Sequence, residues 1–203
     1  MAKYVSINEA LDLVKSGDYI VTGLGAAEGR EFMTNLHTIA DRVKDVMVSN
    51  CLPMGAYEFI ANPAYKDSFT TEGWFYTPLL RKAQANGNVS FIPNHLHLAA
   101  TKRLCYRTPD IYVGIASMPD KHGYVSLSTS NTYEMKMIKA AKTVILEINP
   151  NAPRTFGDVQ LHLDDVDYVV EVDYPMPELA DAEPNEKDLA IGKIIAGMIN
   201  DGD

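Results

Sequence analysis

The sequence predicts an α/β fold, an open and mainly parallel sheet with helices on both faces, formed by residues 1–203 as one domain. Two observations lead to this prediction. Residues 18–50 read as a strand, a loop of small residues, an amphipathic helix and a second strand, which is the order that builds parallel sheets. Residues 111–116 and 143–148 are almost continuously apolar, as strands covered on both faces should be.

The remaining elements follow from local signals along the chain. A capping box at Ser6-Ile-Asn-Glu9 opens a short helix that ends at Ser16-Gly17. Helical spacing of apolar residues predicts a second helix, through Phe32, Leu36, Ile39 and Val43. Strands are expected at 18–23, 45–50, 89–92, 111–116 and 143–148, and further helices at 78–86, 97–104 and 132–142. Short hairpins are expected around Gly123 and around Gly157-Asp158, and an acidic, proline-rich loop at 175–188.

The final helix has an apolar face with the spacing i, i+3, i+4, i+7, formed by Ile191, Ile194, Ile195 and Met198. Such a face is expected to be buried. The helix leads into Asn200-Asp-Gly-Asp203, a turn signal that normally starts a new element. The chain therefore resembles the first half of a longer protein.

Composition limits the class of protein. A chain of 203 residues with 46% hydrophobic and 22% charged residues can bury one substantial core, which excludes global disorder. A net charge of −9 argues against nucleic-acid binding, because phosphate contacts need clustered cations. Cys51 and Cys105 form no CxxC pattern, no apolar leader opens the chain, and no apolar run reaches membrane-spanning length. A soluble cytoplasmic protein with reduced thiols is expected.

The loop Gly23–Gly29 joins a predicted strand to a predicted helix, and its small residues would let a ligand approach the backbone. Gly25, Ala26, Ala27 and Glu28 are therefore candidate substrate-binding residues. An ordinary tight turn between strand and helix is the alternative. Glu28 either contacts the substrate or stabilises the positive end of the following helix.

Other candidates follow later strands, where open parallel sheets place their ligands. Asn149 ends the strand at 143–148, and Ser117, Met118 and Pro119 follow the strand at 111–116 within a Pro-Asp turn. Asn94-His95-Leu96-His97 has alternate histidines, but no third ligand stands nearby in a recognisable motif, so no metal site is predicted. Arg81 lies near the start of a predicted helix and is expected on its solvated surface, and no catalytic triad pattern is present.

Several segments together resemble the family of acetyl-CoA hydrolases and CoA-transferases, most closely the 4-hydroxybutyrate and butyryl CoA-transferases. These segments are Gly25-Ala-Ala-Glu28, Phe69–Phe75, Ser117–Tyr124, Ala141–Asn149 and Pro153–Asp158, in an order and spacing that fit from about residue 6 onward. The resemblance implies two similar α/β halves with the active site between them, of which this chain is the N-terminal half. It favours a substrate-facing role for the first loop, although Gly29 replaces a proline found in many family members, which is expected to loosen the loop. It also implies cleft-lining positions for Asn94 and His95 and a CoA contact for Arg81.

The resemblance also implies a mechanism in which a glutamate attacks the acyl-CoA thioester. That glutamate belongs to the C-terminal half, so no catalytic residue is assigned here and the chain alone is expected to be inactive. The implied function moves CoA between 4-hydroxybutyrate or butyrate and acetate, with CoA as a substrate and no metal or redox cofactor. Expected partners are acyl-CoA, short carboxylates, the C-terminal half and a second copy in a homodimer or larger oligomer. The alternatives are an acetyl-CoA hydrolase, a non-catalytic assembly module that pairs with a separate C-terminal chain, and a sugar-phosphate isomerase or deaminase.

Overall fold

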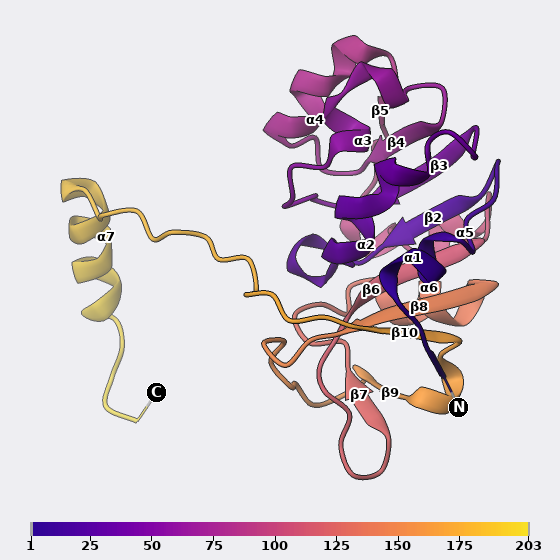
Figure 1. Ribbon diagram of the computed structural model, residues 1–203. Helices are drawn as coiled ribbons and strands as arrows, with labels where there is room; N and C mark the ends of the chain where they lie inside the picture. The colour runs from indigo at the N-terminus through magenta and orange to yellow at the C-terminus, as the bar shows by residue number, and fades with distance from the viewer. Residues whose placement is uncertain (1, 203) are drawn as a thin grey trace.

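The computed structural model describes residues 2–202, and within them eight strands form one sheet (Figure 1). The strand order is β1-β10-β8-β6-β2-β3-β4-β5, and each neighbouring pair is parallel. This confirms the predicted open α/β sheet. The strands are β1 (Lys3–Tyr4), β2 (Tyr19–Thr22), β3 (Val46–Asn50), β4 (Phe69–Gly73), β5 (Val89–Phe91), β6 (Ile111–Ala116), β8 (Thr143–Ile148) and β10 (Tyr168–Glu171).

Short helices connect these strands. The α-helices are α1 (Ile7–Leu11), α2 (Arg30–Asn35), α3 (Glu58–Ala61), α4 (Pro78–Ala83), α5 (Thr101–Leu104), α6 (Glu134–Ala140) and α7 (Glu186–Ala196). Single 3₁₀ turns are η1 (Gly25–Ala27), η2 (Leu36–Ile39), η3 (Pro63–Tyr65), η4 (Gln84–Asn86), η5 (Leu96–Leu98) and η6 (Leu163–Asp165). The predicted capping box opens α1, where the Glu9 amide donates to Ser6 Oγ and the Ser6 amide donates to Glu9 Oε2.

Two apolar clusters cover the two faces of the sheet. Along β2, Ile20 packs into one cluster while Tyr19 and Val21 pack into the other, so this central strand is buried on both sides. Helices α1, α2, α3 and α4 complete the cluster around Ile20. Helix α6 and a separate antiparallel pair, β7 (Tyr124–Ser126) with β9 (Gln160–His162), complete the other.

Five local predictions are corrected by the structure. The helix through Phe32 is interrupted after Asn35, because Asn35 and Thr38 bond to backbone carbonyls and the chain tightens into 3₁₀ geometry. The two predicted hairpins are wrong. The strand after Gly123 is β7, and its partner is β9, which lies beyond the Gly157 turn. The first and fifth helices are also shorter than predicted, since α1 ends at Leu11 and α5 begins only at Thr101.

The final helix differs most from its prediction. Three residues of its predicted apolar face, Ile191, Ile194 and Ile195, lie in α7, whereas Met198 lies just beyond its end. The four side chains are 54% to 72% exposed, so this face is not buried within the described chain. Figure 1 shows α7 standing apart from the body at the end of an extended segment. Both faces of the sheet are already covered by other elements, which leaves no apolar surface there for this helix to occupy.

Candidate functional site

The strand order defines where a ligand would bind on this sheet. From β2 the sheet is extended on one side by β3, β4 and β5, and on the other side by β6, β8 and β10. The order therefore reverses between β2 and β6. In open parallel sheets the crevice at the carboxyl ends of such strands is the ligand site. The loops that follow β2 and β6 are those that hold Gly25–Glu28 and Ser117–Pro119.

The loop after β2 lies closely over this reversal point. The Gly23 amide donates to the Val113 carbonyl on β6 at 3.2 Å, and the Gly25 amide donates to the Cys51 carbonyl after β3 at 3.1 Å. Gly25 has a φ of +55°, a left-handed conformation that favours glycine. Ala27 is buried against Ile115 on β6, whereas Ala26 is half-buried. Hydrogen bonds to strands on both sides therefore fix the path of this loop.

Glu28 ties the same loop to the segment that follows β3. Its Oε1 accepts the amides of Met54 and Gly55 at 3.1 and 3.2 Å, and its side chain is almost fully buried. Burial raises the pKa of Glu28 to about 7, against the lowering effect of the hydrogen bonds it accepts. Glu28 thus binds a neighbouring loop. The start of α2, which was one of the two roles predicted for Glu28, is held by another carboxylate.

That carboxylate belongs to Glu147 on β8. It is fully buried and accepts the amide of Phe32 at 2.7 Å, the amide of Glu31 at 3.1 Å and the hydroxyl of Tyr174 at 2.6 Å. Burial raises the pKa of Glu147 to about 7. The carboxylate satisfies two amides at the start of α2 that have no partner inside the helix, so it fixes where the helix begins.

A third buried acid, Glu134 at the start of α6, accepts the amide of Leu24 at 2.8 Å and that of Tyr133 at 2.9 Å. Glu28, Glu134 and Glu147 are together named the buried carboxylates. Each of them holds backbone amides that lie in or beside the loops at the carboxyl edge. Neither Glu134 nor Glu147 is among the candidate residues that the sequence predicted.

The residues after β6 and β8 are brought close to the first loop. Ser117 is buried, and its Oγ accepts the Ser126 amide at 3.0 Å, so that hydroxyl serves the local backbone. Met118 follows with 46% of its surface exposed, and Pro119 is half-buried. Asn149 is fully buried, and its amide group donates to the Tyr174 carbonyl at 2.9 Å, so it shapes the chain beyond β8.

His95 and Arg81 lie away from this centre, whereas Asn94 lies beside Cys51, whose carbonyl accepts the Gly25 amide. Asn94 and His95 follow β5, the edge strand, three strands from β2. His95 is exposed and stacks on His97 with 5.6 Å between ring centroids. Arg81 is exposed on α4, where its guanidinium donates to the Tyr76 carbonyl. Asn94 also borders a small cavity of about 70 Å³ formed with Cys51, Trp74, Phe75 and Leu96.

Two apolar residues at the carboxyl edge were missed by the sequence reasoning. Leu52 and Met54 follow β3 beside Gly25, and they are 39% and 37% exposed. Leu52 has a φ of +66°, which is unusual for a branched side chain. The motif Cys51-Leu-Pro-Met-Gly55 carried one usable signal, since proline and glycine after a strand mark a loop at the ligand edge.

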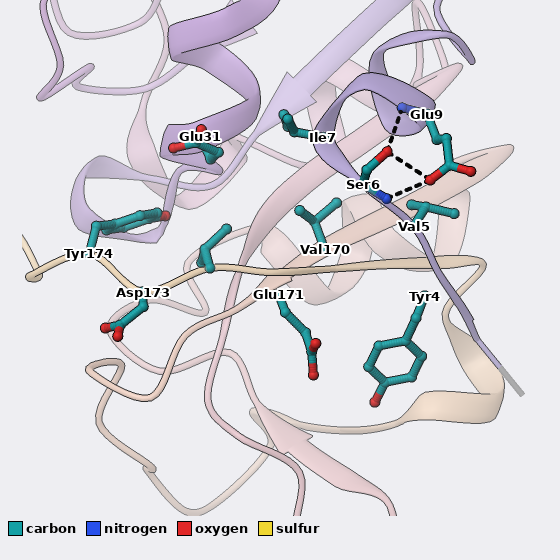
Figure 2. A pocket seen from close by; sticks show the side chains of 11 residues that line it. Tyr4, Val5, Ser6, Ile7, Glu9, Glu31, Val170, Glu171, Asp173 and Tyr174 are labelled. Atoms are coloured by element: carbon teal, nitrogen blue, oxygen red, sulfur yellow. Dashed lines mark hydrogen bonds between the residues drawn. The ribbon is translucent and has the colours of Figure 1, made fainter.

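A larger open groove of about 630 Å³ lies where β10 ends, between α1 and the start of α2 (Figure 2). Four acids line it, and none of its lining residues is a lysine or arginine. Its charge therefore does not suit the phosphates of CoA. Among residues 2–202 no group of three or more histidine, cysteine or acidic residues is placed to hold a metal ion. No helix in this part of the chain has the length and apolarity that a membrane crossing requires.

A parallel sheet with fixed loops at its reversal point, lined by small and apolar residues, is typical of α/β domains that bind ligands at this edge. Residues 1–178 match the family model described as the acetyl-CoA hydrolase/transferase N-terminal domain, and the chain belongs to this family. It is 30% identical over 98% of its length to a succinyl-CoA:cyclohexane-1-carboxylate CoA transferase from Geobacter metallireducens. It is 31% identical over 99% of its length to a probable butyrate:acetyl-CoA coenzyme A-transferase from Syntrophomonas wolfei.

Solved structures agree with this placement. RipA from Yersinia pestis superimposes with a TM-score of 0.87 at 25% identity, over 98% of this chain and 49% of RipA. The chain spans 45% and 46% of the length of the two curated relatives. It therefore corresponds to about half of each of these three proteins.

Proposed function

We propose that this chain forms one wall of the active site of a CoA-transferase that moves CoA between short acyl groups, such as 4-hydroxybutyrate or butyrate, and acetate. The loops at the reversal point of the sheet support this proposal, because their small residues leave the backbone open to a ligand. The names of the relatives support the reaction class, since they transfer CoA between carboxylates.

The proposed chemistry uses a glutamate supplied by the second half. Its carboxylate attacks the thioester carbonyl, CoA leaves as the thiolate, and an acyl-glutamyl anhydride remains. The thiolate then attacks the glutamyl carbonyl, releasing the carboxylate of the first substrate and leaving a glutamyl-CoA thioester. An acceptor carboxylate reverses these steps. The covalent route divides one difficult exchange into easier steps, and main-chain amides can stabilise the oxyanions.

One observation carries the assignment of that glutamate to another part of the protein. Glu28, Glu134 and Glu147 are buried, and each accepts two or more hydrogen bonds from its surroundings. A carboxylate fixed in this way cannot turn toward a thioester without releasing backbone amides. Among the buried acids of residues 2–202, none is therefore free to act as the nucleophile. The contribution that we propose for this half is binding and orientation of the acyl group.

Leu52, Met54 and Met118 are the side chains that we assign to the acyl group. All three follow strands at the carboxyl edge and are partly exposed. Thioether and branched apolar side chains suit a short alkyl chain, and flexible methionines can adapt to its length. Substitution of Met54 or Met118 should therefore change the KM for butyryl-CoA more than that for acetyl-CoA.

The test uses the complete two-half protein with butyryl-CoA, with and without acetate, followed by chromatography of the CoA species. Acetyl-CoA should accumulate in step with released butyrate only when acetate is present. Mass spectrometry should find CoA attached to a glutamate of the second half when acetate is omitted. The 203-residue chain alone should give no exchange, and exchange by that chain would refute the assignment.

The same assay distinguishes an acetyl-CoA hydrolase. A hydrolase would release free CoA at the same rate whether or not acetate is present, because water is its acceptor. This outcome would replace the transferase proposal and would keep the assigned site.

A further inference from the structure

Helix α7 presents an apolar surface that no described part of this chain covers. Every described residue from 178 to 202 is exposed. With 100° between successive residues, Ile191, Ile194 and Ile195 fall within one arc of the helix. Met198 and Ile199 follow directly after its end, and all five side chains are more than half exposed. Monomeric proteins rarely leave such a contiguous surface in water.

The helix is well specified at its start but cannot be stable alone. Asn185 and Asp188 form a capping box, in which Asn185 Oδ1 accepts the amides of Lys187 and Asp188 and Asp188 Oδ2 accepts the Asn185 amide. The helix has 11 residues, however, and isolated helices of this length are marginal in water. The sequence therefore encodes a helix that needs a surface to pack against.

The two faces of the sheet do not offer that surface. Both faces of the sheet carry complete apolar clusters, whose buried residues lie between Ala2 and Val170. The segment before α7 contains Pro175, Pro177 and Pro184 and is extended (Figure 1). Proline-rich segments act as semi-rigid spacers, which holds α7 away from the body.

The comparisons indicate what covers the helix. The model of the N-terminal domain ends at residue 178, where the exposed segment begins. The relatives nevertheless align over 98% and 99% of this chain, which includes α7, and they are about twice as long. The RipA structure likewise covers 98% of the chain. Helix α7 therefore lies within the alignments to the relatives but beyond the match to the N-terminal domain model.

We propose that α7 is the first element of the second half of the protein, and that its apolar face docks in a groove of that half. This inference rests on the two-half protein proposed above. The acids that precede and open the helix specify the chemistry of the groove. Its apolar floor should be bordered by lysine or arginine at the end that receives the N-terminus of α7. In residues 178–188 of this chain, five acids outnumber the one cation, Lys187. These acids are Glu178, Asp181, Glu183, Glu186 and Asp188.

The first experiment compares the 203-residue chain with a chain that ends at Glu178. Both should unfold within about 2 °C of each other, because α7 buries nothing on the body. Amides of residues 188–198 should exchange with solvent as fast as those of an unstructured peptide. Protection of these amides in a monomeric sample would show that the helix packs on its own body and would overturn the proposal. If the sedimentation coefficient rose with concentration and Ile194→Glu abolished this rise, a second copy of the chain would be the occupant. This result would also overturn the proposal.

The second experiment uses the complete protein. The same amides should exchange at least about 100-fold more slowly there, and Ile194→Glu should remove this protection. Lys193→Glu introduces the same side chain on the opposite side of the helix and should preserve the protection. Fast exchange in the complete protein, or equal effects of the two variants, would overturn the docking. Because exchange does not depend on catalysis, a docked helix in a protein without CoA transfer would refute the proposed function alone.

Discussion

Replacing Glu147 by alanine tests the idea that buried carboxylates fix the loops at the carboxyl edge. The substitution removes the acceptor of two amides at the start of α2 and of the Tyr174 hydroxyl. The hydroxyl lies on a half-buried side chain and can turn to water, whereas the Phe32 amide is buried. An unsatisfied buried donor costs about 1–3 kcal/mol. Loss of the hydrogen bonds from the two amides should therefore lower the free energy of unfolding by about 3 kcal/mol.

The assay is thermal unfolding of the 203-residue chain at pH 7.5. A change of 1 kcal/mol shifts the midpoint of a chain of this size by about 2–4 °C, so Glu147→Ala should lower the Tm by about 6–12 °C. Glu147→Gln keeps the volume and one acceptor oxygen and should lower it less. Glu171→Ala, an exposed acid on β10, is the control and should have little effect. If the two alanine variants had equal midpoints, Glu147 would not fix the start of α2.

The dependence of this effect on pH follows from the raised pKa of Glu147, about 7 against an ordinary value of 4.5. Between these values the folded chain binds more protons than the unfolded chain, so its stability falls as the pH rises. The proton-linked part of its contribution is fully present below about pH 4.5, is lost by about pH 7, and amounts to at most about 3 kcal/mol. The hydrogen bonds from the two amides persist above pH 7 and account for the loss expected at pH 7.5. The Tm should therefore fall more steeply from pH 5 to pH 8 in the wild type than in Glu147→Gln. Equal slopes would contradict the argument.

Three further substitutions and one reaction with a thiol reagent test other parts of the structure. Gly29→Ala should lower the Tm, because its β-carbon would lie 2.6 Å from a valine methyl on β6, whereas Gly192→Ala meets no atom within 4 Å and should leave the Tm unchanged. Leu52→Gly should not lower the Tm, because glycine removes a left-handed backbone strain of about 1 kcal/mol and this gain offsets the lost side-chain contacts. Calorimetry measures the Tm of all three variants. A thiol reagent should modify exposed Cys105 in the native chain and reach Cys51 only after unfolding, because Cys51 is buried and its pKa is raised to about 12. A second thiol that reacts at the native rate would place Cys51 at the surface.

The sequence predicted the centre of the sheet better than its margins. Residues of β6 and β8 are buried on both faces, so their apolar runs are unmistakable. Strand β4 lies one strand from the edge and alternates Phe69, Thr70, Thr71 and Glu72, which is a weaker signal. Strand β1 has only two residues, and its register comes from β10 alone. No local pattern could have identified such a strand.

The same contrast applies to the candidate site. The neighbourhood of the loops after β2 and β6 was predictable, because parallel strands bring their carboxyl ends to one edge. The groups that hold those loops were not. Glu134 binds the amide of Leu24 across 110 residues of sequence, and Glu147 binds that of Phe32 across 115. Both partnerships exist only once the sheet is assembled. Gly29 shows a related limit, since loss of the family proline was expected to loosen a loop that is tightly packed here.

The buried carboxylates have a consequence for how such a protein can diversify. Side chains from distant elements fix the backbone path of these loops. The outward-facing residues of the loops are therefore not needed to maintain that path. Ala26, Leu52, Met54 and Met118 can then be randomised together while Glu28, Glu134 and Glu147 stay constant, with little risk of misfolding. A library built on that division would explore new acyl preferences on an unchanged frame.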